Sequence, residues 1–298
     1  MSNSPSGLPF QIPEKLLWLG TRQAGRDWLN RLPDLFEAAR SRFDLQSVGQ
    51  PFAGGYVSLV MPAQRGGEDV VLKLQFVHRE ARHEADALRL WNGEGACRLL
   101  DHDPDLGALL LERCRPGHYL ADAVNIDQLA VLADLLRKLL VPAQAPFTPL
   151  NEEAAGWIAS IEQDWRDAGS PCEKRLVDAA VAAVGDLRSK ETGSVLLHQD
   201  LHGHNVLSVG REAWLAIDPK PLAGDPAFAL SPIVRSFEFG HTKEASLYRL
   251  DRLSEELGLD RERARLWTIA QTMAWAFDSG YSERHFQTCR WLLAGTLG

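Results

Sequence analysis

The segment 196–218 constrains the fold of this chain most strongly, because polar side chains stand there at the borders of short apolar runs. Asp200 follows one apolar run, Asn205 stands directly before the next, and Asp218 directly follows a third. Short apolar runs bounded by turn residues predict strands joined by tight connections. The segment therefore predicts three oxygen-bearing side chains held at the ends of strands.

An Asp, an Asn five residues later and a second Asp after a strand are the side chains used in ATP-dependent phosphoryl transfer. Asp200 is the candidate base, because a carboxylate is ionised at neutral pH and accepts the proton of an attacking hydroxyl. Asn205 and Asp218 offer the kinds of oxygen that Mg²⁺ prefers. His198 is expected to support the loop by bonding to its backbone. The alternative is that Asp200 and Asn205 only cap turns.

The same segment permits a different interpretation, a zinc-dependent hydrolase. His198, Asp200, His202 and His204 alternate along it, and imidazoles with a carboxylate can bind Zn²⁺ and activate water. The spacing matches no common zinc-ligand pattern, and the other histidines are scattered. Phosphoryl transfer is favoured, and a nucleotide-binding module without catalysis is a further alternative.

Lys73 ends an apolar strand predicted at residues 69–74. Its ammonium is expected to hold the α- and β-phosphates of ATP, because an ATP site needs phosphate neutralisation. A carboxylate from the next helix would fix it, with Glu84 the first choice and Glu80 the second. The alternative is an ordinary strand-end lysine in water.

Two further segments are candidates for nucleotide contacts. Gly54 and Gly55 lie in a predicted hairpin at residues 51–60 and would let the backbone approach the phosphates, although a plain turn is the alternative. Backbone groups from Glu112 to Cys114, where two lobes would join, are expected to pair with adenine; the alternative is a plain linker. No Walker A sequence occurs, which argues against a P-loop kinase.

The predicted elements divide the chain into a strand-rich nucleotide-binding part, 1–115, and a helix-rich catalytic and substrate-binding part, 116–298. In the first part a helix is predicted over residues 21–43, and Pro33 is expected to break it. Further helices are predicted at 79–91, 127–140, 152–167, 174–188, 231–238, 243–257, 261–278 and 282–294. Strands before helices indicate an α+β protein.

Composition narrows the partners. The formal net charge of −8 provides no basic field for nucleic acid, and it is compatible with a cationic small-molecule substrate. Glu238 and Asp278 are candidate contacts for such a substrate. No leader-like N-terminus or membrane-length apolar stretch occurs, and the four cysteines lack CxxC spacing, so we expect a cytoplasmic protein without membrane association, disulfides or a cysteine zinc site.

Two stretches carry a family resemblance. Residues 198–207, HQDLHGHNVL, resemble the phosphotransferase signature HGDLHxxNxL. Together with residues 217–228, IDPKPLAGDPAF, they resemble the aminoglycoside and hydroxyurea antibiotic resistance kinases of the streptomycin 6-phosphotransferase group. The similarity extends over most of the chain, from the Gly54 region to residues 256–263.

The resemblance implies a protein-kinase-like fold of two lobes, a small β-rich N-lobe and a larger helical C-lobe. It also implies ATP and Mg²⁺ as cofactors, and transfer of the γ-phosphoryl group to a hydroxyl of a small antibiotic. The roles that it implies are a base at Asp200, metal ligands at Asn205 and Asp218, and a phosphate contact at Lys73.

Two positions depart from the family pattern. Gln199 replaces the usual Gly, a change that a loop tolerates. Ala229 stands where the subgroup tends to have Asp, which is expected to affect the support of the C-lobe or the substrate wall. A kinase of another small metabolite would use the same site, so the sequence leaves the acceptor, its hydroxyl and the oligomeric state open.

Overall fold

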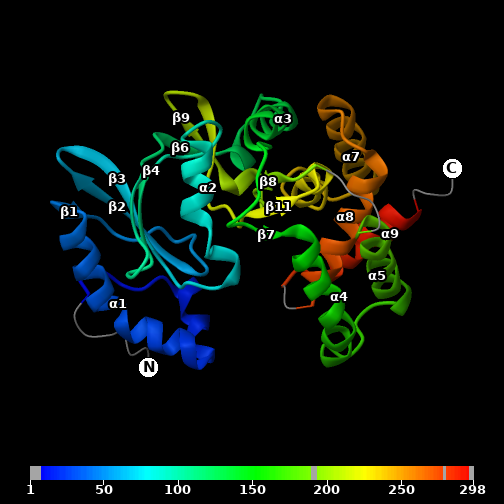
Figure 1. The fold of residues 1–298 in the computed structure, drawn as a ribbon, viewed down its shortest axis with the longest axis horizontal. Coiled ribbons are helices and arrows are strands. Elements are labelled where there is room, and N and C mark those ends of the chain that lie inside the picture. Colours follow the sequence, from blue (N-terminus) through cyan, green and yellow to red (C-terminus); the bar gives the residue numbers. More distant parts are fainter. Residues whose placement is uncertain (1–7, 189–192, 278–279, 295–298) are drawn as a thin grey trace. The chain divides into compact units, whose positions relative to one another are not determined.

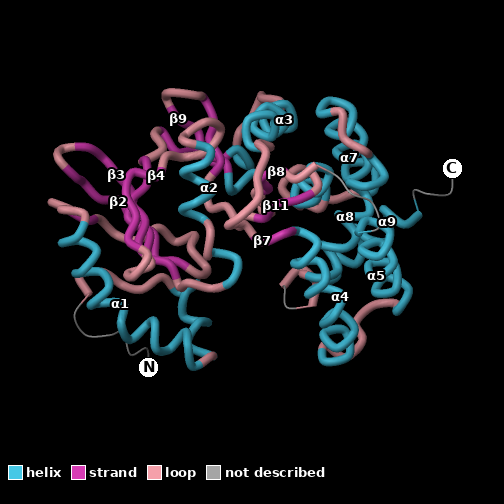
Figure 2. The backbone as a smooth tube through the Cα atoms, in the orientation of Figure 1, coloured by secondary structure: helices cyan, strands magenta, loops and turns pink. Residues whose placement is uncertain are grey.

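The computed structural model of the chain describes residues 8–188, 193–277 and 280–294. The chain divides into two compact units, Met1–Gly117 and His118–Gly298. Strands dominate the first unit and helices the second (Figure 2), which is the predicted α+β composition. The functional roles expected for the two parts stay predictions.

The first unit contains an antiparallel sheet with the strand order β1–β2–β3–β5–β4. Its strands are β1 (Ser47–Val48), β2 (Ser58–Arg65), β3 (Glu68–Gln75), β4 (Leu99–Asp103) and β5 (Ala108–Glu112). Gly66 and Gly67 join β2 to β3 with φ of 59° and 83°, a backbone that glycine adopts without strain. The central strand β3 pairs along its length with β2 and β5, and this fixes its register.

Alternation along β3 separates two environments. Val70, Leu72 and Leu74 belong to the hydrophobic core that includes residues of α1 (Gln23–Arg42). The intervening side chains point to the other face, where α2 (Glu84–Trp91) packs. Figure 1 shows α1 and α2 on opposite sides of these strands. The first unit also has short 3₁₀ helices at Glu14–Thr21 and Arg79–Ala81.

Three predictions for the first unit were wrong in detail. Helix α1 continues through Pro33; burial of Leu32, Leu35 and Phe36 offsets the backbone hydrogen bond that proline cannot make. The expected strand before Gly54 is absent, because residues 49–57 connect β1 to β2 without regular structure. The helix predicted at 79–91 is divided into a 3₁₀ turn and α2.

The second unit is built on helices close to those predicted, around the buried helix α8. They are α3 (Gln128–Leu139), α4 (Leu150–Asp167), α5 (Lys174–Arg188), α6 (Ser231–Val234), α7 (Lys243–Leu257), α8 (Arg261–Ala274) and α9 (Ser282–Ala294). Helix α6 is shorter than predicted, since the chain leaves helical geometry after Arg235. Of the helices in the described ranges, none has the length and apolar character that a membrane span requires.

Two small sheets carry the segment of greatest interest. One has the order β10–β9–β6, with β6 (Pro116–Tyr119), β9 (Val206–Val209) and β10 (Ala213–Ala216). The other has the order β7–β11–β8, with β7 (Thr148–Pro149), β8 (Val195–Leu197) and β11 (Leu222–Gly224). Residues 198–205 connect β8 to β9, and residues 217–221 connect β10 to β11. Both candidate loops are therefore anchored by strands at each end.

Candidate active site

The loop from β8 to β9 is tied to the loop that follows β10 by backbone and side-chain bonds. His198 Nε2 lies 3.0 Å from the carbonyl oxygen of Ile217, and Lys220 N–H donates to the carbonyl oxygen of His198 at 3.0 Å. Ile217 N–H donates to the carbonyl oxygen of Asn205 at 2.9 Å. Burial lowers the pKa of His198 to about 4, so the ring is neutral at physiological pH. The predicted supporting role of His198 is confirmed.

Asn205 and Asp218 are brought next to each other by these bonds. The side-chain amide nitrogen of Asn205 donates to the carbonyl oxygen of Asp200 at 2.8 Å, and its side-chain oxygen takes no part in this bond. Asp218 directly follows Ile217, which is bonded to Asn205, and the φ of Asp218, 57°, lies in the left-handed region that Asp tolerates. An amide oxygen and a carboxylate at neighbouring positions fit the ligand preference of Mg²⁺.

Asp200 is surrounded by cationic groups. Its carboxylate oxygens lie 3.1 Å from Lys220 Nζ, 3.5 Å from an Arg235 nitrogen and 3.9 Å from His202 Nε2. Burial acts to raise the pKa of Asp200, but Lys220, His202 and Arg235 outweigh it and hold that pKa below its ordinary value. The candidate base is therefore ionised and able to accept a proton.

The two permanent cations beside Asp200 share an aromatic support. Lys220 Nζ lies 5.0 Å from the ring centre of Trp275, and the Arg235 guanidinium carbon lies 4.7 Å from it. The sequence reasoning missed all three residues. Lys220 stands two residues after Asp218 in an irregular segment, and this proximity to a predicted ligand was a usable signal; Arg235 and Trp275 gave none.

Glu238 holds the turn that contains the loop histidines. Its Oε2 accepts a hydrogen bond from Gly203 N–H at 2.6 Å, and its Oε1 lies 2.7 Å from His202 Nδ1 and also contacts His204 Nδ1. Burial acts to raise the pKa of Glu238, but the two histidines lower it to about 2. Ligand atoms of these three side chains lie within 4.8 Å of one another and can hold a metal ion.

In the first unit, Lys73 forms a buried ion pair with the predicted partner. Its Nζ lies 2.7 and 2.6 Å from the two carboxylate oxygens of Glu84, and both side chains are at most 5% exposed. Gln75 Nε2 donates to the same carboxylate at 2.5 Å. Glu80, the second choice, lies instead 3.7 Å from His78. The pairing of Lys73 with Glu84 is confirmed, and its contact with phosphates stays a prediction.

Sequence comparison places this geometry in a family. Residues 42–281 match the family described as aminoglycoside/hydroxyurea antibiotic resistance kinase. The chain is 39% identical over 286 residues to a hydroxyurea phosphotransferase of Kitasatospora aureofaciens, covering 92% of this chain and 82% of that protein. The chain belongs to the aminoglycoside/hydroxyurea antibiotic resistance kinase family. It is also 38% identical over 284 residues to a streptomycin 6-kinase of Streptomyces glaucescens, and the match covers 91% of this chain and 92% of that protein.

The fold of this family member agrees with that of a distant solved kinase. A thermostable variant of aminoglycoside phosphotransferase APH(4)-Ia, in ternary complex with AMP-PNP and hygromycin B, matches it with a TM-score of 0.62. The identity is 14%, and the match covers 90% of this chain and 99% of that one. At this identity the likeness shows the fold alone, and it confirms the predicted protein-kinase-like fold.

Membership in a kinase family shows that the zinc-hydrolase interpretation was wrong. The geometry gives the physical reason, because the four proposed ligands do not gather. His198 faces the carbonyl of Ile217, and Asp200 is paired with Lys220. The histidines that do converge, His202 and His204, meet the carboxylate of Glu238.

The remaining nucleotide candidates of this kinase have structural roles of their own. A Cβ atom at Gly55 would lie 2.2 Å from the carbonyl oxygen of Ser58, so a glycine is required there by the close backbone. The backbone N–H of Glu112 donates to the carbonyl oxygen of Arg98 at 2.9 Å, and Cys114 is buried. The contacts of Gly54, Gly55, Glu112 and Cys114 with a nucleotide stay predictions.

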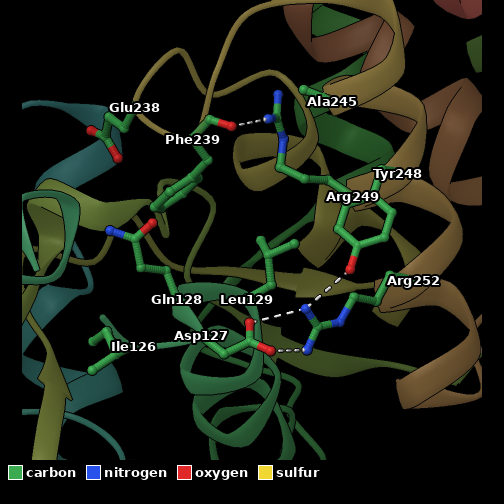
Figure 3. A pocket seen from close by; sticks show the side chains of 10 residues that line it. All are labelled: Ile126, Asp127, Gln128, Leu129, Glu238, Phe239, Ala245, Tyr248, Arg249 and Arg252. Atoms are coloured by element: carbon green, nitrogen blue, oxygen red, sulfur yellow. Dashed lines mark hydrogen bonds and ion pairs between the residues drawn. The ribbon is translucent and has the colours of Figure 1, made fainter. Parts of the chain in front are cut away.

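A cavity of about 390 Å³ in the second unit includes Glu238 in its wall (Figure 3). It is lined by Ile126, Asp127, Gln128, Leu129, Glu238, Phe239, Ala245, Tyr248, Arg249 and Arg252. Asp127 caps α3 and is held by Arg252 at 2.6 and 2.9 Å, and Arg249 donates to the carbonyl of Phe239 at 3.0 Å. The other predicted substrate contact, Asp278, lies outside the described residues.

The two departures from the family pattern also have a structural setting. Gln199 has a φ of 64°, which explains why glycine is usual at this position. Ala229 is buried in the 3₁₀ helix Pro226–Leu230, whose N-terminus is capped by Asp225. Asp225 is in turn held by Arg263 at 2.7 Å, which supports the second unit without a carboxylate at position 229.

Proposed function

We propose that this kinase transfers the γ-phosphoryl group of ATP to a hydroxyl of an aminoglycoside-type antibiotic, with streptomycin the first candidate. The observation that carries the proposal is the environment of Asp200, a carboxylate kept ionised by Lys220, His202 and Arg235. Asn205, which is bonded to the backbone of Asp200, and Asp218 are the side chains proposed to hold Mg²⁺. The relative named streptomycin 6-kinase supports the choice of acceptor. The relative named hydroxyurea phosphotransferase supports the hydroxyl of hydroxyurea as the second candidate.

In the proposed reaction, the acceptor hydroxyl oxygen forms a bond to the γ-phosphorus while the bond from that phosphorus to the β–γ bridging oxygen breaks. ADP leaves with the electron pair of the broken bond. Asp200 orients the hydroxyl and accepts its proton as the new bond forms. Because little covalent catalysis is needed, placement and charge neutralisation set the rate.

The phosphates are proposed to be neutralised by Lys73 and by a magnesium ion. Asn205 and Asp218 would hold Mg²⁺, which when bound supplies positive charge to the phosphate oxygens. Lys73 is proposed to contact the α- and β-phosphates, and Glu84 fixes its ammonium. The contacts proposed from Gly54, Gly55, Glu112 and Cys114 belong to the same nucleotide.

The acceptor is proposed to bind in the cavity of Figure 3. Glu238 lines that cavity and contacts His202, whose opposite nitrogen lies 3.9 Å from Asp200. The cavity is therefore connected to the candidate base through Glu238 and His202, all within the second unit. A carboxylate in its wall suits a cationic acceptor, and Asp278 is a second candidate contact. A reaction that consumes ATP fits the cytoplasmic location expected from the sequence.

A phosphate-transfer assay over a panel of acceptors tests this function. Purified protein, ATP and Mg²⁺ are incubated with streptomycin, other aminoglycosides, hydroxyurea and choline, and ADP release and the mass of each acceptor are measured. Acceptor-dependent ADP release with phosphorylated streptomycin or hydroxyurea supports the proposal. Phosphorylation of choline alone would show that the proposed acceptor class is wrong. ATP binding without transfer to any acceptor would contradict the proposed phosphoryl transfer.

A further inference from the structure

Lys220 and Arg235 place two cations on the candidate base. Lys220 Nζ lies 3.1 Å from Asp200 Oδ2, and an Arg235 nitrogen lies 3.5 Å from Asp200 Oδ1. The side chain of Lys220 is 25% exposed and that of Arg235 is 12% exposed. Both rest against Trp275. Two cations therefore lie beside the carboxylate of Asp200, and Arg235 is also within electrostatic reach of Glu238.

A cation beside a general base has a cost, because it stabilises the ionised carboxylate and weakens it as a base. The cost is offset if the same cation also stabilises negative charge that gathers in the transition state. Asp200 is proposed to contact the hydroxyl that attacks the γ-phosphorus. In that arrangement an ammonium 3.1 Å from the carboxylate of Asp200 would lie close to the oxygens of the transferred group.

We propose that Lys220, supported by Arg235 and Trp275, forms a binding subsite for the phosphoryl group as it passes from ATP to the acceptor. The inference rests on the proposed kinase reaction and adds a residue to it. Lys220 keeps its proton throughout, while Asp200 takes the proton of the hydroxyl and ADP takes the electrons of the broken P–O bond. Lys220 contacts the phosphoryl oxygens, and Arg235 is a positioning residue that holds Asp200.

The division of labour follows from the side chains. The Lys220 ammonium has three donors on a flexible stem and is partly exposed, so it can contact Asp200 and a phosphoryl oxygen together. Arg235 is less exposed than Lys220 and its guanidinium lies against the Trp275 ring, which limits its movement. Neither residue is needed for ADP alone, because Lys220 is proposed to bind the phosphoryl group that ADP lacks and Arg235 is proposed to position Asp200.

Three variants test the subsite: Lys220→Met, Lys220→Arg and, as a matched control, Lys174→Met. Lys174 pairs with Asp178 on the solvent face of α5 and lies outside the site. The measurements are kcat for the acceptor phosphorylated by the wild type, the affinity for ADP with Mg²⁺, and the gain in that affinity when fluoroaluminate is added. Fluoroaluminate with ADP imitates the phosphoryl group in transit, and thermal unfolding reports whether each variant is folded.

Removal of the ammonium in Lys220→Met is expected to lower kcat roughly 100- to 1,000-fold, the usual effect of removing one preorganised donor. ADP affinity should stay unchanged, while the gain on adding fluoroaluminate should disappear. Lys220→Arg should recover kcat to within about tenfold of the wild type, because the charge is retained. Lys174→Met should match the wild type in every measurement.

The result that overturns the inference is a folded Lys220→Met protein that keeps the wild-type kcat or the wild-type gain with fluoroaluminate. In that case acceptor phosphorylation by the wild type would still support the proposed function. If no acceptor is phosphorylated but the fluoroaluminate gain depends on Lys220, the subsite stands and the acceptor assignment fails. A wild type that binds no nucleotide would overturn both.

Discussion

Two charged centres in this kinase are built in different ways. Lys73 and Glu84 form an almost fully buried pair between a central strand and a helix, with Gln75 adding one bond. Asp200 lies instead in a loop, contacted by charged groups from residues far along the chain, among them Lys220 and Arg235. The first centre is one buried pair, and the second is a network of several charged groups.

This difference predicts which property of the protein, stability or turnover, each centre controls. A buried one-to-one pair is stable only as a pair, because either charge left alone in the interior is costly. The Asp200 network shares its charge among several partners, so losing one partner changes chemistry more than folding. We expect substitutions in the first centre to affect stability and substitutions in the second to affect turnover.

The largest effect is expected for Asp218→Ala. Removing a proposed Mg²⁺ ligand should lower kcat by roughly 1,000-fold or more, because charge neutralisation by the metal is a main source of rate. The Mg²⁺ concentration needed for half-maximal activity should rise, while the unfolding midpoint changes little. Steady-state kinetics over a Mg²⁺ titration measure this, with Asp134→Ala on the exposed face of α3 as the control. An unchanged Mg²⁺ requirement would remove Asp218 from the metal site.

Lys73 and Glu84 sharpen the comparison through stability. Lys73→Met or Glu84→Met alone should cost about 3–5 kcal/mol of unfolding free energy, because each leaves a buried charge unpaired. The double substitution should cost less than either single one, since two apolar side chains fill the site without a charge. Urea unfolding of the three variants measures this. If the two single costs simply add, the pair is not the isolated unit described above.

Glu238 makes the second region sensitive to pH. Its pKa of about 2 in the folded protein lies below the ordinary 4.5, so its contribution is complete above 4.5 and is lost as the pH falls toward 2. The pKa of His202 is raised above 6.5 by Glu238 and Asp200, against the lowering effects of burial and Arg235. The His202 contribution is therefore complete below 6.5 and is lost at higher pH. The contributions of Glu238 and His202 to stability are both complete only between pH 4.5 and pH 6.5.

Glu238→Gln is expected to cost about 1–2 kcal/mol of unfolding free energy at pH 5.5, a figure reduced for partial exposure to solvent. The cost should shrink as the pH is lowered toward 2. Denaturant unfolding of the wild type and the variant at several pH values measures it. A cost that is the same at pH 5.5 and pH 2.5 would show that charge on Glu238 does not hold the turn.

The smallest effect is expected at Gln199. Its φ of 64° costs a residue with a Cβ roughly 1 kcal/mol, and glycine removes that strain but gains freedom in the unfolded chain. Gln199→Gly also removes a buried side-chain amide nitrogen that lacks a hydrogen bond among the described residues. We expect a net stabilisation below about 1 kcal/mol, measured by thermal unfolding. Gln199→Ala, which keeps the strain, is the control, and it should not be stabilised.

Most of the regular structure could be predicted from apolar periodicity, because it reflects which face of an element is buried. Helices α3, α4, α5, α7 and α9 and the strand ending near Lys73 follow this pattern closely. The effects of Pro33 and Gly54 were predicted incorrectly. Packing of α1 keeps the helix continuous through Pro33, and the segment around Gly54 is an irregular connection instead of a hairpin. Local residue preference is weak where tertiary burial is large.

The candidate site shows the same limit. The Lys73–Glu84 pair could be predicted because both residues lie on regular elements close in sequence. Arg235 and Glu238 contact the 198–205 loop, and Trp275 contacts Arg235. All three follow β11 in the sequence, and no local pattern indicates that they converge on this loop. Lys220 alone had a signal, its position two residues after Asp218.

Transfer of label from [γ-³²P]ATP to streptomycin or hydroxyurea, measured with the wild type and Asp200→Ala side by side, tests the central claim most directly. The account predicts label on the acceptor with the wild type. With the variant it predicts a rate lower by roughly 100- to 10,000-fold but unchanged ATP binding. Equal transfer by the two proteins would contradict the role of Asp200 as the base of a phosphoryl transfer.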